Sequence, residues 1–179
     1  KKALKIYAAN HAPKVILPKD LNTYIEFSIR KTSESNIRFN NVRFAGKDLS
    51  AIEALMGGCD ILVAGPPCQR HSNLNNHSRR DDPRNNLYIS VAAYASLLKP
   101  KYIAIENVQT VIHAKSSVVS RTKSLLQSLG YIISEVTING TDVGLAQTRK
   151  RHFLLAKDSS INVLPLENFI SAYKVHFNQ

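Results

Sequence analysis

The sequence predicts an α/β fold, in which short apolar strands alternate with helices. Four segments have the length and apolar content of strands: residues 59–65, 101–105, 131–138 and 151–156. Two longer segments between them, residues 86–98 and 118–129, have apolar residues at helical spacing. Such alternation is typical of a mostly parallel sheet with flanking helices, which places its ligands at the carboxyl ends of the strands. The length of 179 residues fits a single domain, 1–179.

The N-terminal part is predicted to be a helix followed by a mixed polar segment. Residues 2–9 have helical apolar spacing, whereas residues 11–42 are polar and poorly periodic. Residues 31–36 have the composition of a loop. Residues 49–56 are expected to form a short helix that stops at Gly57.

A buried strand and a long basic loop are predicted next. Residues 61–64 are all apolar, which is typical of a strand buried on both faces in a parallel sheet. Pro66 and Pro67 end that strand, and residues 66–86 contain four arginines, two histidines and almost no apolar side chains. Structureless loops of this length commonly act as lids or binding loops.

The second half of the chain is predicted to contain the remaining helices and strands. The helix at 86–98 is expected to bury one face, formed by Leu87, Val91, Tyr94 and Leu98. Residues 101–105 form the second buried strand, and the amphipathic helix at 118–129 stops at Gly130.

Charge and composition restrict the class of partner and the compartment. The formal net charge is +11, which favours a polyanion such as nucleic acid, although a solvated basic surface has the same charge. The two cysteines do not form a disulfide framework, which fits a reducing compartment. No apolar run approaches the roughly 20 residues of a membrane span, and no signal peptide is visible. We expect no membrane and no metal site.

Three reactive or charged clusters adjoin predicted strands. Cys68-Gln69 follows the first buried strand, Glu106-Asn107 follows the second, and residues 147–151 (QTRKR) precede the last. Each cluster alone also has a structural interpretation: a cysteine packed as a small apolar residue, a glutamate at a helix end, or a solvated basic run. Cys59, at the start of the strand, is interpreted as a core residue.

Taken in order, these blocks resemble the signature motifs of the cytosine-5 DNA methyltransferase family. The three strongest matches are Pro-Cys-Gln at 67–69, Glu-Asn-Val at 106–108 and the QxRxR pattern at 147–151. Weaker matches to further family blocks are found at residues 2–10, 48–49 and 82–88. The resemblance implies a Rossmann-like S-adenosylmethionine-dependent methyltransferase fold.

The resemblance also implies the catalytic roles. Cys68 is the nucleophile that adds to carbon 6 of cytosine, and Glu106 shares a proton with nitrogen 3 of the ring. Arg151 stabilises charge at the carbonyl oxygen of the base, whereas Arg149 positions the loop or the backbone. A base stacked in a duplex has to be flipped out to reach Cys68.

The implied cofactor is S-adenosylmethionine and the implied partner is double-stranded DNA with a flipped cytosine. Asp48 and Leu49 are expected to contact the adenine of the cofactor, and Pro66 and Leu87 to pack near it. The residues expected to contact the substrate are Gln69, Ser72, Arg84, Asn107 and Gln147.

Two departures from the family pattern affect these expectations. Arg70-His71 stand where the family has a small residue and an aromatic one, and the seven glycines include no GxG cofactor loop. We therefore expect an incomplete catalytic domain, with a second chain or a missing segment that provides the cofactor loop and the recognition domain. The segment 11–42 is longer than the family's usual link and has no assigned role.

Several alternatives remain open. The leading hypothesis is the modification enzyme of a restriction system, located in the bacterial cytoplasm or nucleoid, or in the nucleus of a eukaryote. A second hypothesis is the transfer RNA branch of the same family, which has the same catalytic residues. A third is an inactive homologue that binds nucleic acid, and a fourth is a basic α/β domain in which the motif match is coincidental.

Overall fold

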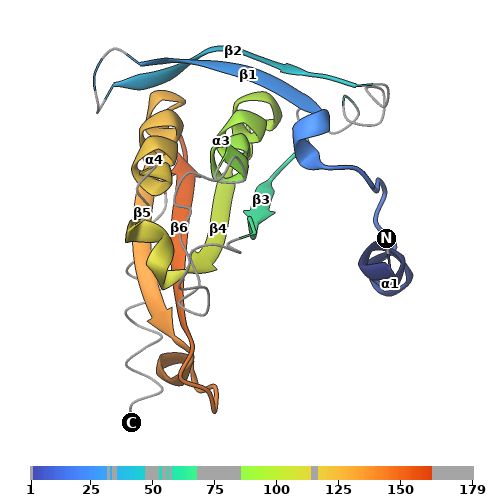
Figure 1. Ribbon diagram of the computed structural model, residues 1–179, viewed down its shortest axis with the longest axis vertical. Coiled ribbons are helices and arrows are strands. Elements are labelled where there is room, and N and C mark those ends of the chain that lie inside the picture. Colours follow the sequence, from blue (N-terminus) through green and yellow to red (C-terminus); the bar gives the residue numbers. More distant parts are fainter. Residues whose placement is uncertain are drawn as a thin grey trace, which may run out of the picture.

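The computed structural model describes residues 2–31, 33, 36–46, 53, 56, 58–67, 86–113 and 117–162. Its centre is a four-stranded sheet, with two helices on one face and a two-stranded hairpin packed on those helices (Figure 1). None of the helices in this part of the chain is long and apolar enough to cross a membrane. The predicted α/β class is confirmed.

The elements follow one another in an order close to that predicted. The N-terminal region contains α1 (Lys2–His11), the 3-10 helix η1 (Leu21–Thr23), β1 (Ile25–Lys31) and β2 (Ile37–Phe44). The sheet and its helices are built from β3 (Ile61–Ala64), α3 (Asn86–Leu98), β4 (Tyr102–Val108), η3 (Gln109–His113), α4 (Val118–Ser128), β5 (Tyr131–Asn139), η4 (Gly140–Val143) and β6 (Lys150–Asp158). The strand order in the sheet is β3-β4-β6-β5.

The sheet is mixed, whereas the sequence predicted a mostly parallel one. β3 and β4 are parallel, but β6 is antiparallel to both β4 and β5. The physical reason lies in the connection between β5 and β6, where residues 140–149 contain only the short η4. A parallel neighbour requires a crossover of a dozen or more residues, usually a helix, so this short connection returns the chain in the opposite direction.

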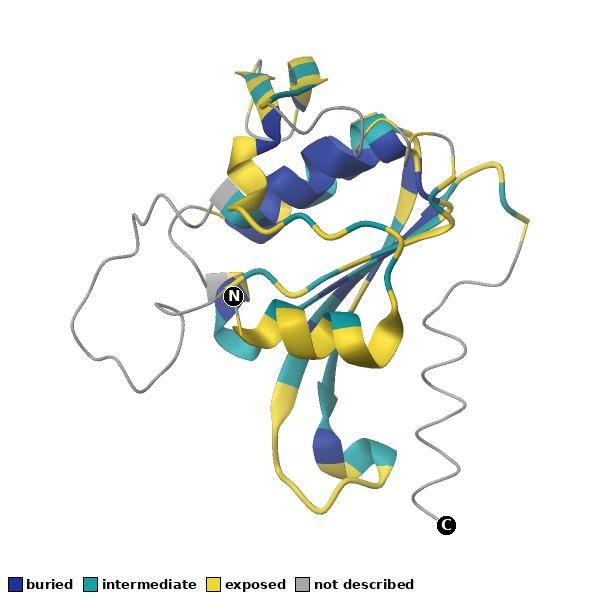
Figure 2. Ribbon diagram, turned by 90° about the vertical axis from the view of Figure 1, so that its right-hand side faces the viewer, coloured by how far each residue is buried: buried dark blue, intermediate teal, exposed yellow. Residues whose placement is uncertain are grey.

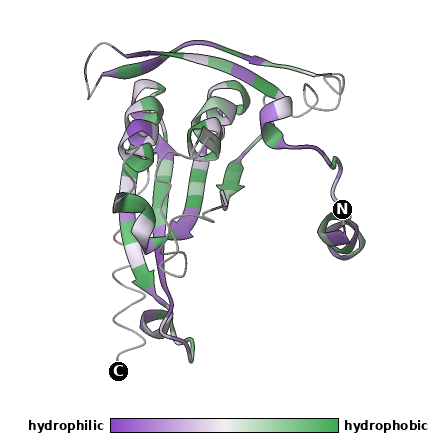
Figure 3. Cartoon of the chain, in the orientation of Figure 1, coloured by the Kyte–Doolittle hydropathy of each residue, from purple (hydrophilic) through white to green (hydrophobic). Residues whose placement is uncertain are grey.

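The two faces of the sheet differ in burial. On one face Ile103, Ile105 and Leu154 are almost fully buried, in the same apolar cluster as residues of α3 and α4. On the other face Ile61 is 61% and Val63 is 73% exposed, although β3 is apolar throughout (Figure 3). The prediction that this strand is buried on both faces was therefore wrong for the described part of the chain.

α3 is buried on nearly all sides instead of one. Every residue from Tyr88 to Ala95 is buried (Figure 2), because the helix lies between the sheet and the hairpin. A helix that is apolar all round belongs inside a core. Leu87, expected on the buried face, is only half-buried.

The hairpin β1–β2 was not predicted, because the polar segment 11–42 hides its alternation. Ile25, Phe27 and Phe39 face the helices, and polar residues alternate with them on the outer face. The register shifts between Ser28 and Ile29, where Asn40 is an extra residue in β2. Such a bulge breaks the period of two that identifies a strand in a sequence.

The helix predictions at 2–9 and 118–129 are confirmed by α1 and α4. α4 stops where predicted, since Gly130 has a φ of +91°, in the left-handed region that favours glycine. Most of the helix predicted at 49–56 and most of the basic loop 66–86 lie outside the described residues.

Substitution of Leu125 should reveal how much α4 depends on its buried face. Leu125 is fully buried in the apolar core, so Leu125→Ala should lower the free energy of unfolding by about 2–5 kcal/mol, through lost burial and a residual cavity. Ile132→Ala is the control, because Ile132 is an aliphatic residue that is 47% exposed. Urea unfolding measures both. Equal losses in the two variants would contradict the burial assigned to α4.

Candidate active site

The candidate site begins where the parallel strands β3 and β4 end side by side. Ala64 pairs with Ile105, so Gly65 follows beside Glu106. A methyl group built on Gly65 would lie 3.7 Å from the Glu106 Oε2 atom, so the two backbones place Glu106 directly against the turn that follows β3. Cys68 comes three residues after Gly65, outside the described residues.

Glu106 forms an ion pair with Arg151 on the open face of the sheet. The Arg151 Nε atom lies 2.7 Å from Glu106 Oε1, and the two side chains are 21% and 42% exposed. In the β4–β6 ladder Glu106 pairs with Phe153 and Val108 with Arg151, so the two charged residues are diagonal neighbours on one face. A carboxylate and a guanidinium thus lie together at the solvent-accessible end of β4.

Glu106 lies within a strand, whereas the sequence predicted it just after one, and Arg151 lies within a strand as predicted. Glu106 to Val108 are the last three residues of β4, and Lys150 and Arg151 are the first two of β6. The ladder continues because every residue of β4 has a partner in β6. Backbone pairing with β6 holds Glu106, and pairing with β4 and β5 holds Arg151, more rigidly than a loop would.

Asn107 ties the end of β4 to the turn after β3. Its side chain is 3% exposed, and its Nδ2 atom donates a hydrogen bond to the Pro66 carbonyl at 3.3 Å. Its Oδ1 atom accepts one from the Val108 amide at 2.8 Å. Asn107 thus fixes the backbone two residues before Cys68, and the substrate contact predicted for it from the sequence stays a prediction.

A family model described as C-5 cytosine-specific DNA methylase matches residues 1–178. The chain belongs to this family. Its curated relatives include the type II methyltransferase M1.BsuMI of Bacillus subtilis, 33% identical over 162 residues, which are 90% of this chain and 35% of that protein. The type II methyltransferase M.Sau3AI of Staphylococcus aureus is 30% identical over 135 residues, 70% of this chain and 33% of that protein. The chain thus spans about a third of the length of these relatives.

Solved structures of methyltransferases share the fold. Dnmt2 methyltransferase of S. pombe matches with a TM-score of 0.56 at 21% identity, over 96% of this chain and 43% of that one. A mutant DNMT2 of Spodoptera frugiperda matches with a TM-score of 0.57 at 17% identity, over 89% of this chain and 40% of that one. The predicted methyltransferase fold is confirmed.

The other predicted site residues of this family member are only partly brought together. Gln147 and Arg149 are exposed in the turn before β6, where the Arg149 amide donates to the Gln147 carbonyl at 3.0 Å. Pro66 and Leu87 are half-buried. The predictions for Asp48, Leu49, Cys68, Gln69, Ser72 and Arg84 concern residues outside the described part of the chain.

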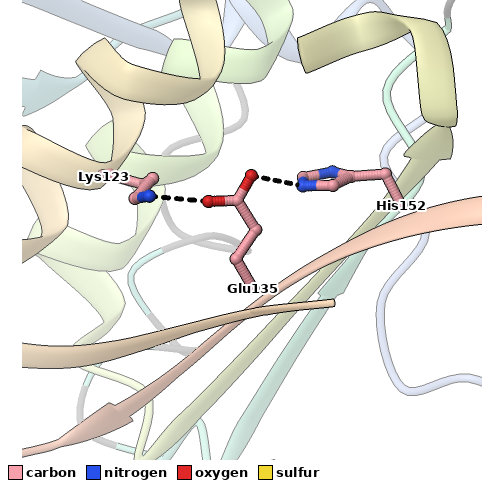
Figure 4. A network of polar contacts seen from close by, with 3 residues as sticks. All are labelled: Lys123, Glu135 and His152. Atoms are coloured by element: carbon pink, nitrogen blue, oxygen red, sulfur yellow. Dashed lines mark hydrogen bonds and ion pairs between the residues drawn. The ribbon is translucent and has the colours of Figure 1, made fainter. Parts of the chain in front are cut away.

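A polar network that the sequence analysis missed lies on the covered face of the sheet (Figure 4). Glu135 of β5 accepts hydrogen bonds from the Lys123 Nζ atom at 2.6 Å and bonds the His152 Nε2 atom at 2.8 Å. His152 is only 1% exposed and directly follows Arg151. No signal in the sequence identified these residues, because three elements distant along the chain provide them.

The pKa of the Glu135 carboxyl group reflects two opposing effects. Burial raises this pKa, but the hydrogen bonds from Lys123 and His152 outweigh burial, and the net shift is downward. Glu135 therefore stays ionised below its ordinary titration range. The charge is balanced within the network by Lys123.

Cys59 is the cysteine that the structure describes, and it fits the predicted core role. It is half-buried and packs against the apolar cluster around Ile25 and Tyr94. Burial raises the pKa of its thiol, and Asp60 raises it further. A thiol with a raised pKa is a poor nucleophile at neutral pH.

Asn107→Ala should destabilise the protein by about 1–3 kcal/mol, since it leaves the Pro66 carbonyl and the Val108 amide without their partner. Asn40→Ala is the control, because Asn40 is an exposed residue on the outer face of the hairpin. Chemical denaturation of both variants measures the difference. A loss for Asn40→Ala as large as that for Asn107→Ala would count against the positioning role.

The contribution of Glu135 to stability should depend on pH. Because the folded-state pKa is lowered from the usual value of 4.5, the contribution is complete above that value and is lost as the pH falls through the folded pKa. The difference in unfolding free energy between the unsubstituted protein and Glu135→Gln should therefore shrink between pH 7 and the acid range. A difference that stays constant down to pH 3 would contradict this linkage.

Proposed function

We propose that this chain is the catalytic core of an enzyme that transfers a methyl group from S-adenosylmethionine to carbon 5 of cytosine in DNA. The observation that supports this most directly is the Glu106–Arg151 pair at the end of β4, beside the turn that leads to Cys68. Family membership gives the reaction class. The names of the relatives favour a role as the modification enzyme of a restriction system.

The reaction needs a nucleophile because carbon 5 of cytosine reacts poorly by itself. In the proposed mechanism the Cys68 thiolate adds to carbon 6, and electrons move through the ring toward nitrogen 3 and the carbonyl oxygen. Glu106 shares a proton with nitrogen 3, and the Arg151 guanidinium stabilises charge at the oxygen. Carbon 5 would take the methyl group from S-adenosylmethionine, which would leave as S-adenosylhomocysteine. A base would then remove the proton from carbon 5, the double bond between carbons 5 and 6 would form again, and the Cys68 thiolate would be released.

The Glu106–Arg151 pair suits this mechanism in its geometry and exposure. Both side chains are partly exposed, so a flipped base can reach them from the open side. The Glu106 carboxylate and the Arg151 guanidinium now pair with each other. A bound base would replace part of this ion pair. Because the backbone ladder fixes both residues, the rearrangement is confined to the side chains.

S-adenosylmethionine would supply the methyl group when bound. Pro66 and Leu87 each keep part of an apolar surface accessible, which fits packing against the cofactor. Asp48 and Leu49 are the proposed adenine contacts. Gln69, Ser72 and Arg84 are the proposed substrate contacts.

We propose that further protein completes the sheet next to β3. Within the described residues β3 pairs only with β4, and its open face exposes Ile61 and Val63. A cofactor loop and a recognition domain, on a missing segment or a second chain, would account for the larger size of the relatives. The methyltransferase domain formed by residues 1–179 is then an incomplete unit.

Covalent trapping on DNA tests the proposal. DNA with fluorine at carbon 5 of its cytosines cannot release the enzyme, so the full protein with S-adenosylmethionine should form a stable adduct. Cys68→Ala should abolish the adduct, whereas Cys59→Ala should retain it, since Cys59 packs in the core. Denaturing gel electrophoresis with labelled DNA measures both.

Each other outcome leads to a different function. Methylation of transfer RNA without a DNA adduct would support the RNA branch of the family. Binding of DNA without any methyl transfer would indicate an inactive homologue. An adduct that persists in Cys68→Ala would overturn the assignment of the nucleophile.

A further inference from the structure

Two buried polar side chains lie next to each other beneath the Glu106–Arg151 pair. Asn107 and His152 are direct partners in the β4–β6 ladder, so their side chains share the covered face of the sheet. They are 3% and 1% exposed, among the apolar side chains of the core. Burying a polar side chain costs free energy unless it forms hydrogen bonds, so we asked what these two residues hold in place.

The bonds of these two residues extend in opposite directions across the sheet. Asn107 reaches the Pro66 carbonyl at the β3 end, and His152 reaches Glu135 in β5. Glu135 also binds Lys123 of α4. Asn107, His152 and Glu135 thus form a row of polar side chains that Lys123 connects to this helix. The row therefore spans the sheet from the turn before Cys68 to the helix layer.

The bonding of His152 is one-sided. Its Nε2 atom lies 2.8 Å from Glu135 Oε1, but its buried Nδ1 atom has no hydrogen-bond partner among the described residues. Glu135 is thus the one polar contact that orients the imidazole there. Glu135 itself is 30% exposed, so the network reaches solvent on the side of Lys123.

We propose that His152 is a positioning residue for Arg151, and that Glu135 acts through it. Consecutive residues of a strand point to opposite faces, so anchoring His152 below the sheet fixes the backbone from which Arg151 projects above it. A rotation or shift of β6 at this point would therefore have two effects at once: it would break the His152–Glu135 bond and move Arg151 away from Glu106. This inference rests on the proposed function, because it concerns the reaction of the same site.

Steady-state kinetics of the full protein tests the proposal. His152→Leu keeps an apolar side chain of useful size but removes the bond to Glu135. We expect kcat to fall by roughly 10- to 100-fold, as small misplacements of catalytic groups do, with KM for DNA and for S-adenosylmethionine within about twofold. His152→Gln, whose amide can still donate to Glu135, should recover most of the loss.

Glu135→Gln gives a second variant that the fold should tolerate, since Glu135 is partly exposed. Glu135→Gln should also lower kcat, as His152→Leu does. The matched control is Glu26→Gln, because Glu26 also pairs with a cation across two strands, in the β1–β2 hairpin. That control should leave kcat unchanged.

A measurement independent of activity separates this inference from the proposed function. The Arg151 Nε–H group that faces Glu106 should exchange slowly with solvent, and NMR should show that His152→Leu and Glu135→Gln accelerate the exchange. If the unsubstituted protein transfers no methyl group, the proposed function is wrong. The exchange of the Arg151 Nε–H group would then still test the positioning role of His152.

Three outcomes would overturn the positioning role. The first is unchanged kcat and unchanged Arg151 exchange in both variants. The second is a loss in His152→Leu that His152→Gln does not restore. The third is a fall in kcat that merely follows a fall in Tm, with the same loss in Glu26→Gln.

Discussion

The antiparallel pairing of β6 with β4 is the constraint on which the candidate site depends. It brings Arg151 beside Glu106 and His152 beside Asn107, although more than 40 residues separate the partners along the chain. Register in a strand pair is strict, because a slip of one residue would exchange the two faces. Here such a slip would place a guanidinium in the apolar core and an imidazole in solvent. Burial of Ile105 and Leu154 on the covered face opposes it.

Much of the architecture could be predicted because it depends on local patterns. The spacing of apolar residues identified α3 and α4, and Gly130 marked the end of α4. Apolar runs identified the strands of the sheet. Strand direction could not be predicted in the same way, since it depends on whether a connection can cross over, and residues 140–149 resemble any polar loop. The hairpin was missed because the bulge at Asn40 breaks its alternation.

The candidate site could be predicted only as far as its motifs extend. The family resemblance implied that Glu106 and Arg151 act on the same base, but the ion pair between them was not predicted. The sequence could not indicate that Asn107 turns to the covered face and holds Pro66, because its side-chain direction follows from its place in β4. His152 was missed for a related reason. Its partner Glu135 belongs to a different strand, and one histidine in a basic run has no distinguishing pattern.

The two faces of the sheet divide the work of the site. The open face leaves Glu106 and Arg151 partly exposed, as the proposed reaction with a flipped base requires. The covered face holds Asn107 and His152 in an environment with little water, where hydrogen bonds are stronger and rotamers are restricted by packing. Alternation along a strand joins each exposed charged residue to a buried anchor one position away. Rigidity at Arg151 therefore does not require that Arg151 itself be buried, and an accessible charge can remain well positioned.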